Sequence, residues 1–143
     1  MKIAIINGPN LNLLGKRETN LYGQQDFATF YQGLQNKYPQ VEWAYFQSNI
    51  EGELIDFIQK TGYSFDGIIL NAAAYTHTSV GIADAVKAVD SPVIEVHISN
   101  IWSREPYRHT SYISPVAKGV IAGFGLLSYE LAVSYLLKIQ KAN

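Results

Sequence analysis

Apolar runs of strand length alternate with segments of helical period along the whole chain. The runs lie at residues 2–7, 41–48, 67–71, 92–97 and 119–122. Parallel strands are buried on both faces and need crossover connections, so this alternation is typical of a parallel sheet covered by helices. The sequence therefore predicts an α/β fold, a flavodoxin-like doubly wound five-stranded parallel sheet with helices on both faces.

The segments between the runs predict four helices. Asp26 is a good N-cap for the first helix, which ends before Pro39. Apolar residues at helical spacing from Leu54 predict a second helix that stops at Gly62, and those from Val80 predict a third that ends before residue 92. The last helix is expected over 126–141. A chain of 143 residues with 48% apolar content can bury one core, so we expect 1–143 to be a single catalytic domain.

Charge and composition exclude several classes of protein. The formal net charge is −1 and the pI is near 6.3, so no basic excess exists to bind nucleic acid or an anionic membrane. The absence of cysteine excludes disulfides, thiolate metal sites and cysteine nucleophiles, and it suits a cytoplasmic protein. Residues 119–137 approach the length of a membrane span, but their glycines and Glu130 favour a buried strand that leads into a helix.

Two connections are longer than a typical loop between a strand and a helix. Residues 8–25 and 98–118 both follow the carboxyl ends of predicted strands, where open α/β sheets bind ligands. Glycines at positions 8, 15 and 23 can serve as hinges or supply positive φ angles. We expect 8–25 to be a lid over an active site.

Arginine and histidine are rare in this chain and fall near the same predicted sheet edge. The chain has three of each, and they are Arg17, Arg104, Arg108, His77, His97 and His109. Polar side chains also stand at the ends of strands, namely Asn7, Ser48, Asn71 and His97. The sequence therefore predicts one polar pocket at this edge.

Arg17 and Tyr22 lie in the same stretch of the expected lid. A phenol has a pKa of ~10 and is a poor base at neutral pH, but an adjacent guanidinium favours the phenolate. The pair therefore indicates a general base, although such pairs also serve packing alone.

Other chemistries match the sequence poorly. A phosphate-binding P-loop fails because Gly15 comes seven residues after Gly8 instead of five. A receiver domain needs acidic residues after the first strand and an aspartate in place of Asn71. The sequence has no H-E-x-x-H zinc motif and no G-x-S-x-G serine elbow, and its lysines do not favour imine chemistry. A flavodoxin-like module that binds a small molecule or nucleotide without catalysis stays open as an alternative.

Five blocks of sequence occur in an order that resembles one enzyme family. They are NGPNLNLLG followed by RE and YG, then QSN and EG, then NAAAYTHTS, then IEVHISN, then RE and YRHTS. Together they resemble the type II 3-dehydroquinate dehydratases from the first strand to the last helix. The resemblance implies a hydro-lyase of the shikimate pathway that makes aromatic amino acids. It would remove water from 3-dehydroquinate by trans elimination through an enolate, without metal or cofactor.

The resemblance also implies roles for individual residues. Tyr22 is the implied base, held ionised by Arg17, and Asn10 positions a water against the enolate oxygen. His97 is the implied general acid, and Glu95 orients it. Further residues implied to bind substrate are Ile98 and Ser99 at the carboxylate, Asn71, His77 and Arg108 at the ring hydroxyls, and Asp84 in the site of a neighbouring subunit.

The family pattern implies trimers packed into a dodecamer, and this chain departs from the pattern at several positions. Ala72-Ala73 replaces a frequent Pro-Gly, Trp102-Ser103 replaces His-Ala, Ala83 replaces an arginine, and Thr110 replaces a histidine. No departure removes a proposed catalytic group. They affect the expected subunit contact near Asp84 and the pocket rim around Trp102.

Overall fold

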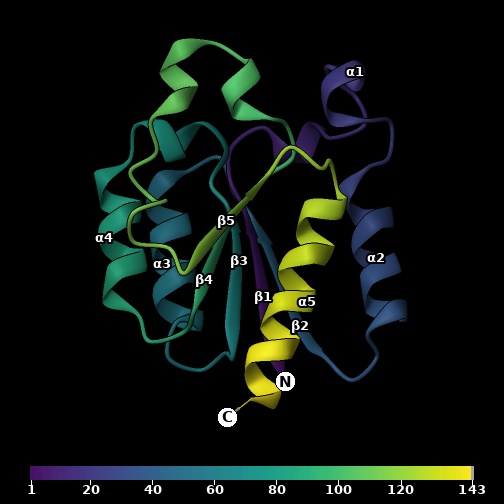
Figure 1. Cartoon of the computed structure of the whole chain (residues 1–143), viewed down its shortest axis with the longest axis vertical. Helices are drawn as coiled ribbons and strands as arrows, with labels where there is room; N and C mark the ends of the chain where they lie inside the picture. The colour runs from purple at the N-terminus through teal and green to yellow at the C-terminus, as the bar shows by residue number, and fades with distance from the viewer. Residues whose placement is uncertain (143) are drawn as a thin grey trace.

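Five strands form one parallel sheet in the order β2-β1-β3-β4-β5 (Figure 1). The structure is a computed structural model and describes residues 1–142. The strands are β1 (Lys2–Asn7), β2 (Glu42–Gln47), β3 (Gly67–Asn71), β4 (Val93–His97) and β5 (Gly119–Ala122). Every strand pair is parallel, and the order reverses direction at β1, as in flavodoxin-like sheets. The predicted fold class is confirmed.

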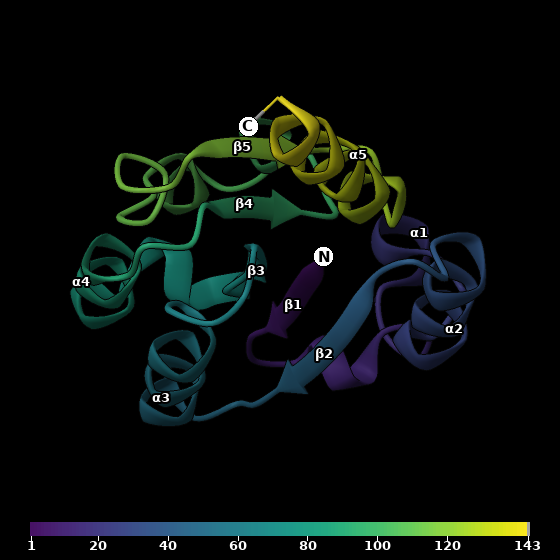
Figure 2. The same cartoon turned by 90° about the horizontal axis from the view of Figure 1, so that it is seen from below.

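Helices cover both faces of the sheet, as Figure 2 shows in a view along it. On one face lie α2 (Phe27–Lys37) and α5 (Leu127–Lys141), and on the other lie α3 (Glu51–Thr61) and α4 (Val80–Ala88). Side chains alternate between the faces along each strand. In β1, Ile3 and Ile5 belong to the apolar cluster under α2 and α5, whereas Ala4 and Ile6 belong to the cluster under α3 and α4.

The ends of the helices follow the predicted signals. The Asp26 carboxylate accepts the Thr29 backbone N–H at 2.8 Å, as expected of an N-cap. The second helix stops at Gly62, but this glycine has an ordinary right-handed φ of −66°. A Cβ at Gly62 would lie 2.2 Å from Cγ1 of Val89, so the helix end needs glycine for a close approach and not for a left-handed turn.

The apolar segment 119–137 forms β5 and most of α5, so the strand that leads into a helix is confirmed, but β5 is partly exposed where a buried strand was expected. Among the described residues, no helix combines the length and the apolar character needed to cross a membrane.

Both long connections lie above the carboxyl edge of the sheet and contain short helices (Figure 1). The 8–25 segment holds η1 (Leu11–Leu13) and α1 (Thr19–Tyr22), and the 98–118 segment holds η3 (Ile101–Ser103) and η4 (Pro106–His109). A further short turn, η2 (Ala73–His77), follows β3 at the same edge. These three segments surround the end of the sheet.

The three glycines of the 8–25 segment serve two purposes. Gly15 and Gly23 have positive φ angles of 86° and 84°, as the sequence suggests. Gly8 has no positive φ, and its N–H donates to the Asn71 carbonyl at 2.7 Å. A Cβ at Gly8 would lie 2.5 Å from the Ala72 carbonyl oxygen, so the chain just after β1 can pass this close to the chain just after β3 only with a glycine at position 8.

Candidate active site

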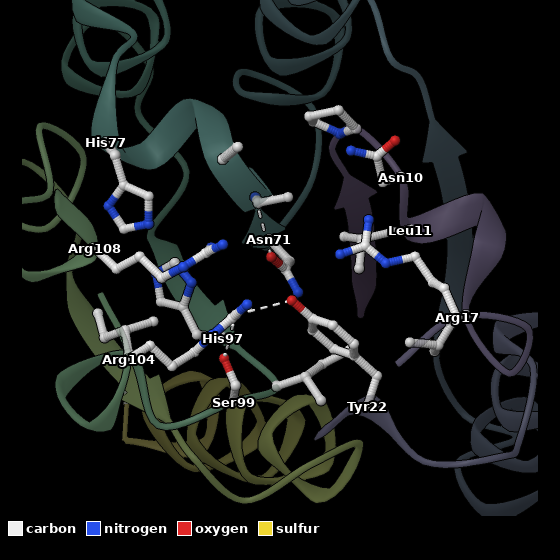
Figure 3. A pocket seen from close by; sticks show the side chains of 16 residues that line it. Asn10, Leu11, Arg17, Tyr22, Asn71, His77, His97, Ser99, Arg104 and Arg108 are labelled. Carbon is white, nitrogen blue, oxygen red and sulfur yellow. Dashed lines mark hydrogen bonds between the residues drawn. The ribbon is translucent and has the colours of Figure 1, made fainter. Parts of the chain in front are cut away.

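A pocket opens at the carboxyl edge of the sheet between the 8–25 segment, η2 and the 98–118 segment (Figure 3). Nine of the eleven residues predicted to form the site line it. They are Asn10, Arg17, Tyr22, Asn71, His77, His97, Ile98, Ser99 and Arg108. The structure thus brings together side chains from segments that are far apart in the sequence.

The other two predicted residues lie outside the pocket lining. Glu95 is fully buried behind His97 on the same face of β4, where it contacts the histidine. Asp84 is exposed on α4 and does not line the pocket of its own chain.

Three of the polar residues singled out at the sheet edge also lie elsewhere. His109 packs against Trp102 in a tilted arrangement, with ring centroids 5.3 Å apart, and is exposed. The Ser48 hydroxyl accepts the Ile50 N–H at 2.9 Å at the entry to α3. Asn7 is fully buried, does not line the pocket and contacts the Tyr129 hydroxyl.

Tyr22 is half-buried in α1, and its hydroxyl points into the pocket (Figure 3). The hydroxyl accepts a hydrogen bond of 2.8 Å from Nη1 of Arg104, which also donates to the Ser99 hydroxyl at 3.1 Å. The guanidinium of Arg104 therefore places positive charge against the phenol oxygen. The sequence predicted Arg104 to lie in this pocket as one of the arginine cluster, but it gave Arg104 no role in catalysis or substrate binding.

Arg17 lies beside the same tyrosine but contacts it differently. Its guanidinium carbon is 5.3 Å from the Tyr22 ring centroid, compared with 5.5 Å for the guanidinium carbon of Arg104. Nη2 of Arg17 is 2.5 Å from the Glu18 carboxylate. Two guanidinium groups therefore lie near the ring, and the one that contacts the hydroxyl is Arg104.

His97 and Glu95 form a buried pair on β4. Nε2 of His97 lies 2.8 Å from Oε1 of Glu95, and because a carboxylate accepts, Nε2 carries the hydrogen. Burial by itself raises the pKa of Glu95, but hydrogen bonds from His97, Ser114 and Thr76 outweigh it and lower this pKa to about 2. Glu95 is therefore a carboxylate at neutral pH and can stabilise a protonated His97.

His77 presents a hydrogen-bond acceptor to the pocket. Its Nδ1 lies 2.7 Å from the Thr110 carbonyl, which can only accept, so Nδ1 carries the hydrogen. Burial, together with the nearby His97 and Arg108, lowers the pKa of His77 and keeps the ring neutral. The remaining nitrogen, Nε2, is then an acceptor suited to a hydroxyl of a ligand.

Asn71 is held in one orientation by its neighbours. Its Oδ1 accepts the Ala73 N–H at 3.1 Å, so its Nδ2 must face the Tyr129 hydroxyl, 2.8 Å away. Tyr129 in turn donates to Oδ1 of Asn7 at 2.8 Å. Sequence reasoning did not find Tyr129, because it comes from α5 and nothing local links it to the ends of β1 and β3.

Asn10 and Ala73 hold left-handed backbone conformations at the pocket wall. Their φ angles are 68° and 51°. Asparagine adopts this conformation readily, and the Asn10 N–H also donates to Oδ1 of Asn49 at 3.0 Å. Alanine does so at a cost, so Ala73 holds a strained backbone conformation.

The lining of the pocket is basic and carries groups for proton transfer. Arg17, Arg104 and Arg108 line it together with Tyr22 and His97, and none of the lining residues is acidic. The described part of the chain has no group of three or more His, Cys, Asp or Glu side chains that could hold a metal ion. This arrangement can bind a small anion and move protons to and from it.

The fold and the site together define a flavodoxin-like α/β protein with an acid–base pocket for a small anion. The family model described as dehydroquinase class II matches residues 1–137. The chain belongs to this family, and the resemblance seen in the sequence motifs is confirmed.

Similar proteins agree with the family. A 3-dehydroquinate dehydratase of Campylobacter hominis is 52% identical over 141 residues, which are 97% of this chain and 91% of that protein. One from Fusobacterium nucleatum is 51% identical over 145 residues, covering 96% and 97% of the two chains. The crystal structure of a type II dehydroquinase from Butyrivibrio crossotus superimposes with a TM-score of 0.91 at 45% identity, covering 95% and 97% of the two chains.

Proposed function

We propose that this chain dehydrates 3-dehydroquinate to 3-dehydroshikimate, as a hydro-lyase of the shikimate pathway. The family and the relatives named 3-dehydroquinate dehydratase support this function. The observation that carries the mechanism is the placement of Tyr22, in contact with Arg104, in one pocket with the His97–Glu95 pair. This placement supplies a base and an acid for the two proton transfers of an elimination.

Tyr22 is the proposed base. Its phenolate takes a proton from the carbon next to the ketone, and the electron pair of that bond forms the enolate. Arg104 donates directly to the phenol oxygen and Arg17 lies beside the ring, so two positive charges lie close to the proposed base. Asn10 positions a water against the enolate oxygen, a stabilisation typically worth about 3 kcal/mol of the barrier.

His97 is the proposed acid. As the enolate collapses, the carbon–oxygen bond breaks and His97 gives its proton to the departing hydroxyl, so that water leaves. Glu95 stabilises the protonated histidine through the 2.8 Å contact. Tyr22 ends with one more proton and His97 with one fewer, and exchange with water restores both.

The remaining polar groups of the pocket hold the substrate. The backbone amides of Ile98 and Ser99 and the Ser99 hydroxyl anchor the carboxylate, and the Arg104 contact with Ser99 adds positive charge there. Asn71, His77 and Arg108 contact the ring hydroxyls, and the Nε2 acceptor of His77 suits a hydroxyl donor. A binding module without catalysis is not favoured, because it needs no paired base and acid.

Asp84 lies outside its own pocket, so its proposed role requires a second subunit. Assembly as a dodecamer, a tetramer of trimers, and a cytoplasmic location stay predictions of the family resemblance.

The function is tested by mixing purified protein with 3-dehydroquinate and following the ultraviolet absorbance of the conjugated enone product. Separate runs contain a chelator or borohydride. We expect turnover that survives both additions. Loss with chelator would indicate a metal mechanism, and loss with borohydride plus substrate would indicate a lysine imine.

The base is tested by Tyr22→Phe, which removes only the phenol oxygen. We expect turnover to fall by about two to four orders of magnitude, because proton transfer by a positioned base contributes that much. The matched control is Tyr63→Phe, at an exposed tyrosine outside the pocket, which should leave turnover unchanged. Near-normal turnover of Tyr22→Phe would contradict the assignment.

A further inference from the structure

The carboxylate of Glu95 accepts hydrogen bonds from three hydroxyl groups as well as from His97. Its Oε1 accepts from Nε2 of His97 at 2.8 Å, from the Ser111 hydroxyl at 2.8 Å and from the Thr76 hydroxyl. Its Oε2 accepts from the Ser114 hydroxyl. Thr76 belongs to η2 and the two serines belong to the 98–118 segment, so two separate segments meet at this carboxylate.

Three of the four hydrogen bonds to this charge come from neutral hydroxyl groups. Glu95 is fully buried, and within residues 1–142 its one ion pair is with His97, which is charged only when protonated. A buried carboxylate without such donors would take up a proton. The three hydroxyls therefore keep Glu95 ionised even when His97 is neutral.

The hydroxyls are held in place by the surrounding backbone and stay out of the pocket. The Ser111 oxygen accepts the backbone N–H groups of Ile113 at 3.2 Å and Ser114 at 3.0 Å, and Thr76 is fully buried. Thr76, Ser111 and Ser114 do not line the pocket. Their hydroxyl groups are connected to the pocket through Glu95 and His97.

We propose that Thr76, Ser111 and Ser114 are positioning residues that disperse the charge of Glu95 and so set the pH range in which His97 delivers its proton. This inference rests on the proposed function. A carboxylate that accepts fewer hydrogen bonds holds its remaining donor more strongly. Removing one hydroxyl therefore strengthens the hold of Glu95 on the His97 proton, and the histidine keeps that proton to higher pH.

Removing one of the three hydroxyls leaves the other titratable and charged groups near His97 unchanged. His77 lies with its ring centroid 6.4 Å from that of His97, and the pocket also contains Arg17, Arg104, Arg108 and Tyr22. None of them bonds to the three hydroxyls. Both variants at one position keep these charged neighbours, so the difference between their pH profiles does not depend on them.

The experiment uses two matched pairs of variants. Thr76→Val removes a hydroxyl and keeps the shape of the side chain, whereas Thr76→Ser keeps the hydroxyl. Ser114→Ala and Ser114→Thr form the second pair, at a half-buried site where loss of the fold is least expected. The measurement is kcat for 3-dehydroquinate against pH, with thermal unfolding as the check on folding.

In a plot of kcat against pH, we expect the alkaline limb to shift to higher pH by about half a unit or more in Thr76→Val and Ser114→Ala. The limb should stay at its wild-type position in Thr76→Ser and Ser114→Thr. A limb that stays in place, moves down, or moves equally in both members of a pair overturns the proposal.

A second readout separates this inference from the proposed function. The titration of His97 by NMR in the protein without substrate should show the same upward shift, whether or not the protein dehydrates 3-dehydroquinate. Wild-type protein that fails to turn over the substrate would overturn the function, and an unshifted His97 titration would overturn the inference.

Discussion

The charge of Glu95 has consequences for stability as well as for catalysis. Its pKa is lowered from 4.5 to about 2 in the folded protein, by hydrogen bonds that outweigh the effect of burial. A carboxyl group with a depressed pKa contributes stability above its unfolded pKa and loses it as pH falls toward the folded value. The contribution is therefore complete at neutral pH and is lost between about pH 4.5 and pH 2.

Glu95→Gln tests this pH dependence, because the amide keeps the shape of the side chain and does not titrate in this range. Between pH 7 and pH 3 we expect wild-type protein to lose about 2 kcal/mol more of its free energy of unfolding than the variant does. Urea unfolding at the two pH values measures the difference. Equal losses in the two proteins would show that Glu95 is not a buried carboxylate in the folded state.

Single residues were predictable where their position in the chain determined their place in the fold. Asn71 and His97 end neighbouring parallel strands, so the topology alone brings them to one edge. The contact between Arg104 and Tyr22 joins two long segments, and its geometry depends on how both are folded. Local sequence patterns carry no information on such a contact.

Regular elements were predicted closely, and short ones were not. The apolar runs predicted β1, β3 and β5 at their observed bounds, and in β1 and β3 this is because buried parallel strands have a strong apolar signal. The short helices η1, α1, η3 and η4 were not predicted, because three or four residues are too few to show a period. Tyr22 lies in α1, and Arg104 follows η3 directly.

Helix α5 is tied to the sheet by a hydroxyl as well as by apolar packing. Tyr129 is fully buried, donates to Asn7 and accepts from Asn71. Burial raises its pKa, so the hydroxyl stays neutral and can take both roles. Its removal takes away the hydrogen-bond partner of Nδ2 of Asn71 and of Oδ1 of Asn7.

Tyr129→Phe should therefore lower the free energy of unfolding by about 1–3 kcal/mol, the usual cost of leaving buried polar groups unpaired. The matched control is Tyr135→Phe on the same helix, where the side chain is 37% exposed and the change should be within about 0.5 kcal/mol. Urea unfolding of both variants provides the measurement. A Tyr129→Phe protein as stable as the control would mean that water replaces the missing hydroxyl.

At the scale of the whole molecule, binding of an anionic substrate depends on where the charges lie and not on the net charge of the chain. The chain has a formal net charge of −1, yet its pocket holds three arginines and no acidic side chain among the lining residues. Asp84 is the acidic residue that the family resemblance places in the site of a neighbouring subunit. It is exposed on α4, outside the lining of its own pocket. If Asp84 acts in catalysis, it must reach the pocket of another subunit.

Mixed oligomers test this arrangement. Asp84→Ala should lower turnover in every site through the missing neighbour, and Tyr22→Phe should lower it in every site through the missing base. When the two variants are co-expressed with different tags, some sites combine Tyr22 from one chain with Asp84 from another. About a quarter of the sites should then be intact if chains mix at random, so turnover should rise well above that of either variant alone.

The control for this experiment keeps the helix and removes a different charge. Lys87 is exposed on α4, as Asp84 is, and Lys87→Ala should leave turnover near the wild-type value. Sedimentation of each preparation shows whether the subunits assemble. If the mixed oligomers assemble but gain no turnover over the parent variants, Asp84 does not serve a neighbouring site, and the pocket described here would be complete within one chain.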